Sequence, residues 1–139
     1  MPNIVPHLKL THEGARLMLD AAIATAQAMG VPQCIAVVDD GGHLLAFARM
    51  DGAKVLSVDS SLRKAMTAAS SRVPTGNVGA GTDLKLGLAT EGKFVNLKGG
   101  VPIVVDGHVI GGIGVGSGTG EQDLECAQAG LAALAAARS

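Results

Sequence analysis

Aromatic side chains are almost absent from this sequence. It contains two Phe and neither Tyr nor Trp, and its acidic and basic residues nearly balance to a net charge of −1. Proteins that bind nucleic acids present a basic surface to the phosphates and, for single strands, aromatic rings on which bases stack. The composition therefore argues against a nucleic-acid partner. Any ligand has to be held by aliphatic walls, backbone groups and a few charges.

Long apolar runs and paired cysteines are also lacking. No stretch approaches the roughly 20 apolar residues that span a bilayer. The N-terminal residues do not join a charged start to an apolar run, as a signal peptide does. The two cysteines, Cys34 and Cys126, are far apart and form no Cys-x-x-Cys motif. We therefore expect a cytoplasmic protein with no membrane segment and two reduced thiols in its core.

Low-complexity linkers are missing as well. Glycine is frequent, with 20 residues, yet no stretch joins Gly, Pro and Ser without apolar residues between them. Such stretches are typical of flexible linkers. A chain of 139 residues is long enough to bury a core and too short for two domains. We predict a single domain over residues 1–139.

What is present is a succession of helical and strand patterns. Apolar residues three and four apart predict a first helix over His12–Met29, with Thr11 as its N-cap and Gly30 at its end. Aliphatic runs joined by Asp/Gly turns predict two hairpins. The remaining elements are expected as strands 34–38 and 43–48, a helix 58–69 capped by Ser57, a short helical turn within 82–88, strands 101–105 and 108–115, and a last helix that begins at a Thr119–Gln122 capping box.

This order segregates the strands into hairpins with helices around them. Such segregation is typical of an antiparallel sheet layered with helices, so we predict an α+β fold and exclude the alternating βαβ units of a Rossmann domain. Pro102 cannot donate a hydrogen bond to a neighbouring strand. We therefore expect it at a strand start or on an edge strand.

A glycine-rich strand leads into the last helix. Its sequence, Gly111-Gly112-Ile113-Gly114-Val115-Gly116, matches neither common nucleotide-binding fingerprint. Glycine at several strand positions usually marks the close approach of a helix or another backbone, or a bulge at a subunit contact. Together with the alanine-rich last helix, this strand offers a flat surface of small residues, from which we predict a homo-oligomer.

The most suggestive polar cluster is Arg49–Ala53. It places Arg49 and Asp51 where a strand leaves the sheet, close to the start of the second helix. Lys64 follows in that helix and is expected to face the same place, so that two cations would suit a carboxylate or the propionates of haem. The structural alternative is a salt bridge from Arg49 to Asp39 or Asp51 that fixes the hairpin to the helix.

The four histidines have no spacing that is typical of a zinc site. His43 and His108 follow turns, where a solvated imidazole is common. His12 lies in the first turn of a helix, where the helix dipole disfavours a positive charge. We therefore expect a neutral His12 side chain that is able to coordinate iron.

Several short motifs follow one another in a fixed order. They are Val37-Val38-Asp39 with Gly42, Arg49-Met50-Asp51-Gly52-Ala53, Lys64-Ala65 with Thr67-Ala68, Gly99-Gly100-Val101-Pro102-Ile103, and Gly111-Gly112-Ile113-Gly114-Val115 with Asp123. In this order they resemble the hallmarks of the GlcG/HbpS-like haem-binding (haem-degrading) family, which includes the C-terminal domain of PduO-type proteins. The resemblance extends from about Leu10 to Leu134. One departure is Ser117, which stands where the family's turn has another glycine.

The resemblance implies a profilin-like α–β–α layered fold and homo-oligomers from tetramers to octamers. It also implies haem binding, since several members bind haem, whereas others accompany catabolic enzymes. On this basis Gly99 and Gly100 join His12, Arg49 and Lys64 as cofactor-binding candidates, with His12 as the metal ligand. We expect no cofactor other than haem.

Three functions are compatible with these residues. The first is a binding protein that holds haem or a small carboxylate near Arg49, Asp51 and Lys64. The second is a cofactor-free hydrolase or isomerase acting on a small intermediate of a catabolic pathway. In that case Asp39 or Asp51 would be the acid or base, and Arg49 or Lys64 would hold a carboxylate. The third is a purely structural role in an assembly. We favour the first.

Overall fold

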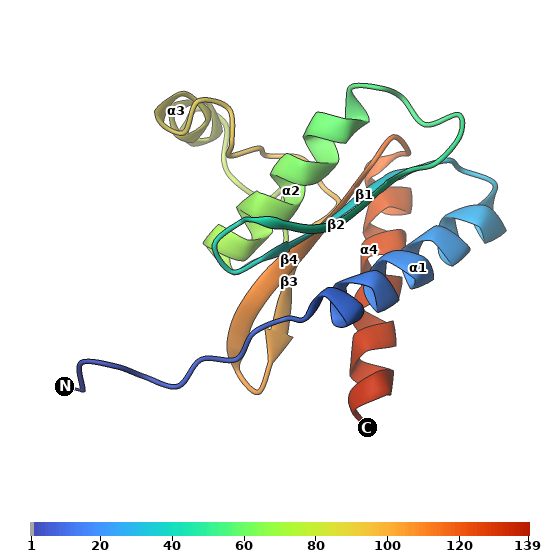
Figure 1. Ribbon diagram of the computed structural model, residues 1–139. Helices are drawn as coiled ribbons and strands as arrows, with labels where there is room; N and C mark the ends of the chain where they lie inside the picture. The colour runs from blue at the N-terminus through green and yellow to red at the C-terminus, as the bar shows by residue number, and fades with distance from the viewer. Residues whose placement is uncertain (1) are drawn as a thin grey trace.

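The fold is described here from a computed structural model that covers residues 2–139 (Figure 1). Strands and helices follow the predicted order. The elements are α1 (His12–Met29), β1 (Cys34–Asp39), β2 (Leu44–Arg49), α2 (Ser57–Ser71), α3 (Thr82–Ala89), β3 (Gly100–Val105), β4 (His108–Gly116) and α4 (Gly120–Arg138).

The strands form one antiparallel sheet in the order β2-β1-β4-β3. Each hairpin supplies two neighbouring strands, and the pairing of β1 with β4 joins the hairpins into a single sheet. This confirms the predicted α+β fold and the exclusion of a Rossmann domain. It also places β3, with Pro102, on an edge of the sheet, as the missing N–H of proline requires.

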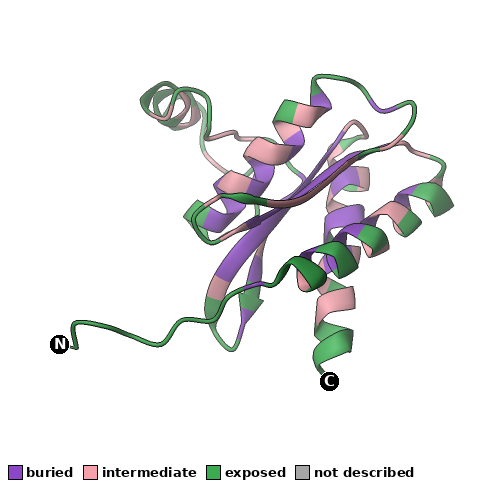
Figure 2. Ribbon diagram, viewed as in Figure 1, coloured by how far each residue is buried: buried purple, intermediate pink, exposed green. Residues whose placement is uncertain are grey.

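Helices cover both faces of the sheet, so that the fold has three layers. Helix α2 lies on one face, and α1 and α4 lie side by side on the other (Figure 1). The larger core lies under α1 and α4, and a smaller core lies under α2, as the buried segments in Figure 2 show. The fully buried side chains of the larger core include Met18, Ile35, Val37, Ile103, Ile113, Val115 and Cys126.

Local signals in the sequence account for most element ends. Thr11 Oγ1 accepts a hydrogen bond from Gly14 N at 3.0 Å, and Gly30 ends α1 in the left-handed conformation with φ 70°. Asp106 and Gly107 have φ of 51° and 78°, as a type I′ turn requires. The predicted capping box at the start of α4 is formed in full.

Two predictions for the middle of the chain were wrong. Ser57 is the first residue of α2 and does not cap it. The amides of Ser57 and Val58 already donate to the carbonyls of Lys54 and Val55, so a preceding turn takes over part of the role of a capping side chain. The short turn expected within 82–88 is the eight-residue helix α3, which stands away from the sheet (Figure 1).

The glycines of β4 are explained by α2. A Cβ atom added to Gly114 would lie 2.1 Å from Ser61 O, and one added to Gly112 would lie 2.2 Å from Ala65 O. The backbone of α2 thus packs directly on the backbone of β4, and every residue from 111 to 116 is buried. This confirms close approach of a helix as the cause of the glycines. It also removes one of the two grounds on which a homo-oligomer was predicted, because the small residues of β4 pack against α2 of the same chain.

Ser117 takes a glycine-like conformation. Its φ is 98°, a backbone conformation that residues other than glycine rarely adopt. Its hydroxyl oxygen accepts a hydrogen bond from Lys54 N at 2.9 Å. The departure from the family's glycine therefore leaves the turn in place, and the serine side chain ties the turn to the loop before α2.

We expect Gly114→Ala to destabilise the protein strongly. The added methyl group would meet the α2 backbone at Ser61 and Ala65, and backbone cannot give way as a flexible side chain can. Overpacking typically costs about 1–3 kcal/mol, and a contact with rigid backbone belongs at the upper end of that range. The free energy of unfolding is measured in urea. Gly79→Ala is the matched control, since a Cβ there meets nothing within 4 Å, and we expect a change within about 0.5 kcal/mol. Equal unfolding midpoints for the two variants would contradict this account of β4.

Candidate functional site

An open groove lies at the end of the sheet where the two hairpin turns meet. The antiparallel pairing of β1 with β4 brings both turns to this end, and α2 ends beside them. The segment between α3 and β3 forms a further wall. The groove has a volume of about 860 Å³, within the range of about 300–1,000 Å³ that is typical of small-molecule sites.

The groove combines apolar walls with cations and imidazoles. It is lined by His7, Asp40, Gly41, Gly42, Met66, Thr67, Ala69, Ser70, Ser71, Arg72, Leu86, Thr90, Lys93, Phe94, Gly107, His108 and Val109. Met66 and Phe94 are half-buried, whereas Arg72 and Lys93 are exposed. Neither of these two cations forms a salt bridge within residues 2–139. The groove therefore offers a ligand both apolar contact and positive charge.

Hydrogen bonds of Thr67 hold the wall between α3 and β3 against α2. The Thr67 hydroxyl donates to Lys93 O at 3.3 Å and accepts from Val95 N at 3.1 Å. Thr67 is itself buried on α2. The spacing between this wall and the helix is therefore built into the fold.

Arg72 enters the groove from an unusual backbone position. It follows the last residue of α2 with φ 64° and ψ 22°, and its N–H donates to Ala68 O at 2.9 Å. Glycine is the common residue at such a left-handed helix end. Any other residue costs on the order of 1 kcal/mol there, and positions of this kind cluster at functional sites. The unfavourable backbone conformation therefore marks Arg72 as a candidate functional residue of the groove.

Two imidazoles reach the groove from different segments. His7 Nε2 lies 3.0 Å from Asp40 Oδ2, and His108 begins β4 directly after the type I′ turn. A carboxylate that receives one ring N–H orients the imidazole and leaves the other nitrogen free to bind a metal or a proton. His7 therefore has a carboxylate neighbour of the kind that orients ligating histidines.

The predicted pairing of Arg49 with Asp39 is excluded by the register of the first hairpin. Arg49 lies opposite Cys34 at one end of β1, and Asp39 lies at the other end. Five steps along a strand separate the two by roughly 17 Å. Asp39 Oδ1 instead accepts from the amides of Gly41 and His43 in the turn. Arg49 forms no salt bridge with Asp51 either in the described residues, so the structural alternative for Arg49 was wrong.

Lys64 does not face solvent beside Arg49. Its side chain is 6% exposed, and Nζ donates to Asp123 Oδ2 at 3.0 Å and to Val115 O at 2.8 Å. Asp123 Oδ1 also accepts from Gly118 N at 3.0 Å. The ammonium is thus held by groups of the chain itself, which corrects the expectation of two neighbouring cations ready to hold a ligand.

Gly99 and Gly100 are both buried beside Lys64. A Cβ atom at Gly99 would lie 3.1 Å from Lys64 Nζ, and one at Gly100 would lie 2.5 Å from Lys64 O. Gly100 N donates to Thr75 Oγ1 at 2.9 Å. The structure gives both glycines a packing role. Their assignment to cofactor binding remains a prediction.

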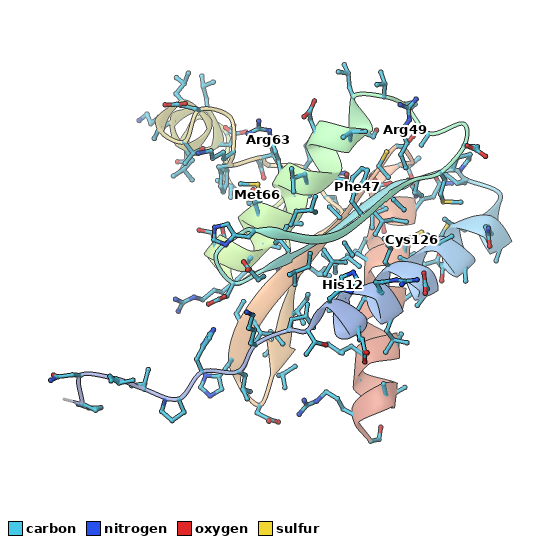
Figure 3. All side chains as sticks on the ribbon, viewed as in Figure 1. His12, Phe47, Arg49, Arg63, Met66 and Cys126 are labelled. Carbon is cyan, nitrogen blue, oxygen red and sulfur yellow. The ribbon has the colours of Figure 1, made fainter. Side chains whose placement is uncertain are left out.

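His12 and Asp51 lie away from the groove. His12 is the first residue of α1, on the face of the sheet opposite α2 and Met66 (Figure 3). It is exposed, as is Asp51 in the turn after β2. The four candidate catalytic residues, Asp39, Arg49, Asp51 and Lys64, are therefore not gathered in one cavity, and the role of His12 as an iron ligand remains a prediction.

Both cysteines are free and buried, as expected for core thiols. Burial raises the pKa of the Cys34 thiol, an effect that the positive charge of Arg49 partly opposes. Burial also raises the pKa of the Cys126 thiol, beside which Gln33 Nε2 lies at 3.9 Å. A raised thiol pKa lowers the fraction of the reactive thiolate at neutral pH. Neither cysteine has the character of a catalytic nucleophile.

Sequence reasoning missed the groove, although one signal pointed to it. Each hairpin turn is followed within a few residues by a histidine, and the second of these, His108, lines the groove, whereas His43 is exposed in its turn. Antiparallel pairing of the two hairpins brings their turns to one end of the sheet. His7, Arg72 and Lys93 carried no pattern of their own, because they come from segments far apart in the chain.

Comparison with known proteins settles the family. Residues 10–132 match the family model described as "Haem degrading protein HbpS-like". The chain belongs to this family. It is 40% identical to protein GlcG of Escherichia coli K12 over 107 residues, which are 76% of this chain and 80% of that protein.

Solved structures show the same fold. Protein ORFY of Klebsiella pneumoniae superposes with a TM-score of 0.90 at 32% identity, and the match covers 98% of each chain. A PduOC:haem complex superposes with a TM-score of 0.83 at 30% identity, covering 91% of this chain and 95% of that one. The resemblance seen in the sequence is thereby confirmed, and with it the layered α+β fold.

Residues 2–139 lack two further features. None of the helices there has the length and apolar character needed to cross a membrane. The same residues contain no group of three or more His, Cys, Asp or Glu side chains arranged to hold a metal ion.

We expect the Lys64–Asp123 pair to be a major stabilising contact. Lys64→Met leaves the Asp123 carboxylate buried without its cation, and breaking a buried pair in this way costs about 3–5 kcal/mol. The double variant Lys64→Met/Asp123→Asn removes the stranded charge, while the amide oxygen still accepts from Gly118 N, so it should recover part of the loss. Urea unfolding measures both.

The exposed Arg138–Asp106 pair provides the control for this experiment. Its side chains are 50% and 71% exposed, and such pairs contribute about 0–1 kcal/mol. If Lys64→Met lost no more stability than Arg138→Met, the interpretation of Lys64 as a structural cation would be wrong.

Proposed function

We propose that this protein binds haem in the groove between α2, the hairpin turns and the segment before β3. The observation that carries the proposal is the combination in one groove of apolar walls, two histidines and two cations that form no salt bridge within residues 2–139. The family description and the PduOC:haem complex support haem as the ligand class.

The chemistry of the lining residues fits haem. A porphyrin needs apolar contact for its ring, which Met66, Leu86 and Phe94 offer. Its propionates need cations at the rim, and Arg72 and Lys93 offer these. Bound haem supplies an iron centre for ligand or redox chemistry. The chain's own residues bind it, orient it and limit its contact with water.

His7 is the residue that would hold the haem iron. The Asp40 carboxylate lies 3.0 Å from His7 Nε2 and can orient the ring, so that Nδ1 would face the iron. His108 lies in the same groove and is the second candidate. His12, on the opposite face of the sheet, is the alternative ligand expected from the sequence.

Haem titration followed at the Soret band tests the site. We expect a saturable complex, and Arg72→Met or Lys93→Met should weaken its affinity at least about tenfold, because each removes one charge-assisted contact of about 1.5–3 kcal/mol. His7→Ala should change the position of the Soret band in the complex. Thermal unfolding of each variant shows whether the fold is intact.

Arg49→Met is the matched control. It also removes an exposed cation, but Arg49 lies at the end of the first hairpin that is distant from the groove. We expect an affinity within twofold of the parent protein. A tenfold loss with Arg49→Met and none with Arg72→Met or Lys93→Met would transfer the site to the Arg49–Asp51 cluster. Absence of any Soret complex would overturn haem binding.

A further inference from the structure

The groove wall between α3 and β3 receives no support from strand pairing. Residues 90–99 form neither helix nor strand, and the preceding helix α3 stands away from the sheet (Figure 1). This segment nevertheless carries one cation of the groove, Lys93, and its half-buried aromatic ring, Phe94. The directions of these two side chains must therefore be set by contacts outside the sheet.

Two threonine hydroxyls hold the backbone on both sides of Phe94. The Thr67 hydroxyl donates to Lys93 O at 3.3 Å and accepts from Val95 N at 3.1 Å. The amide between these two groups, Phe94 N, donates to Thr90 Oγ1 at 2.9 Å. The peptide unit that joins Lys93 to Phe94 is thus bonded both at its carbonyl and at its N–H. Its orientation is fixed, and with it the directions in which the two side chains leave the backbone.

Thr67 is suited to this role because it moves only with α2. It lies in the interior of the helix and is 4% exposed. A threonine within a helix often bonds to the carbonyl four residues earlier in its own helix. The hydrogen bonds of Thr67 to Lys93 and Val95 instead cross to another segment. One buried hydroxyl therefore ties the Lys93 wall to the helix that supplies another wall of the groove.

We propose that Thr67 is a positioning residue that presets Lys93 for the anionic group of the ligand. The inference rests on the proposed binding function of the groove. A lysine side chain is flexible, and a ligand that has to order it loses affinity through the lost entropy. A fixed backbone at Lys93 lowers that cost, because the ammonium is presented from a constant direction. Thr67 acts through Lys93 and needs no contact of its own with the ligand.

Haem titration at the Soret band measures the effect on binding. Thr67→Val keeps the shape of the side chain but removes both hydrogen bonds, so we expect an affinity about fivefold weaker than that of the parent protein. Thr67→Ser keeps the hydroxyl and should stay within about twofold of the parent protein. Far-UV circular dichroism and thermal unfolding verify that each variant is folded.

Thr75→Val is the matched control. Thr75 is buried like Thr67, and its hydroxyl oxygen likewise accepts from a backbone amide, Gly100 N, at 2.9 Å. Thr75 lies outside the lining of the groove. We expect this variant to lose stability and to keep its affinity within about twofold. Equal losses of affinity in Thr67→Val and Thr75→Val would overturn the proposal.

A second substitution at Lys93 separates positioning from a merely structural role. If Thr67 acts through the Lys93 charge, Thr67→Val should change the affinity by about twofold or less once Lys93→Met has removed that charge. A fivefold loss in both backgrounds would overturn the proposal, as would a folded Thr67→Val variant with the affinity of the parent protein. Absence of any Soret complex with the parent protein would instead refute haem binding itself.

Trypsin cleavage after Lys93 provides a measurement that needs no ligand. Cleavage requires the backbone to open locally, and the hydrogen bonds of Thr67 oppose opening at this residue. We expect cleavage after Lys93 to be about fivefold faster in Thr67→Val than in the parent protein or in Thr67→Ser. An unchanged rate would show that the hydroxyl does not hold this wall and would overturn the proposal.

Thr90→Val keeps the proposal testable if Thr67→Val does not fold. Thr90 is only half-buried, and its loss frees the N–H side of the same peptide unit at Phe94. We expect weaker haem affinity and faster cleavage after Lys93 in this variant as well. Parental values in both measurements would overturn the proposal that a fixed backbone presets Lys93.

Discussion

The direct contact between the backbones of α2 and β4 is the constraint on which the rest of the structure depends. Glycine at 112 and 114 removes the side chains that would hold the helix at an ordinary distance from the sheet. The helix is thereby placed close enough for Ala65 and Ala69 to pack on Ala36 and Val38 in the smaller core. Because α2 also supplies one wall of the groove, the position of the candidate site follows from this packing.

The same absence of side chains lets one ion pair connect the layers. Lys64 extends from α2 past Gly99 and Gly114 to reach Asp123 on α4, on the other face of the sheet. A side chain at Gly99 would meet both the ammonium and Asp123. The buried charges are tolerable because three hydrogen bonds satisfy them: the one between Lys64 and Asp123, one from Lys64 to Val115 O and one from Gly118 N to Asp123. A cation that the sequence suggested for ligand binding therefore joins α2 to α4.

The predictable features of this fold are those encoded within a few neighbouring residues. The Thr11 cap, the turn at Asp106-Gly107 and the capping box at Thr119 each depend on a local hydrogen bond or a local φ value, and all three are present. The start of α2 was mispredicted because its first amides bond to backbone carbonyls and not to Ser57. The groove was missed because its residues come from five segments, and only the sheet order brings them together.

The two ends of the sheet consequently differ in the chemistry that they can support. At the end near Ser117, buried glycines, the ion pair and the hydrogen bond to Lys54 fill the space between the layers. At the opposite end, the hairpin turns, the end of α2 and the wall anchored by Thr67 border the open groove. Cations placed where the interior is already full serve stability, as Lys64 does. Cations at the open end, such as Arg72, keep their charge accessible, which is what recognition of an anionic ligand requires.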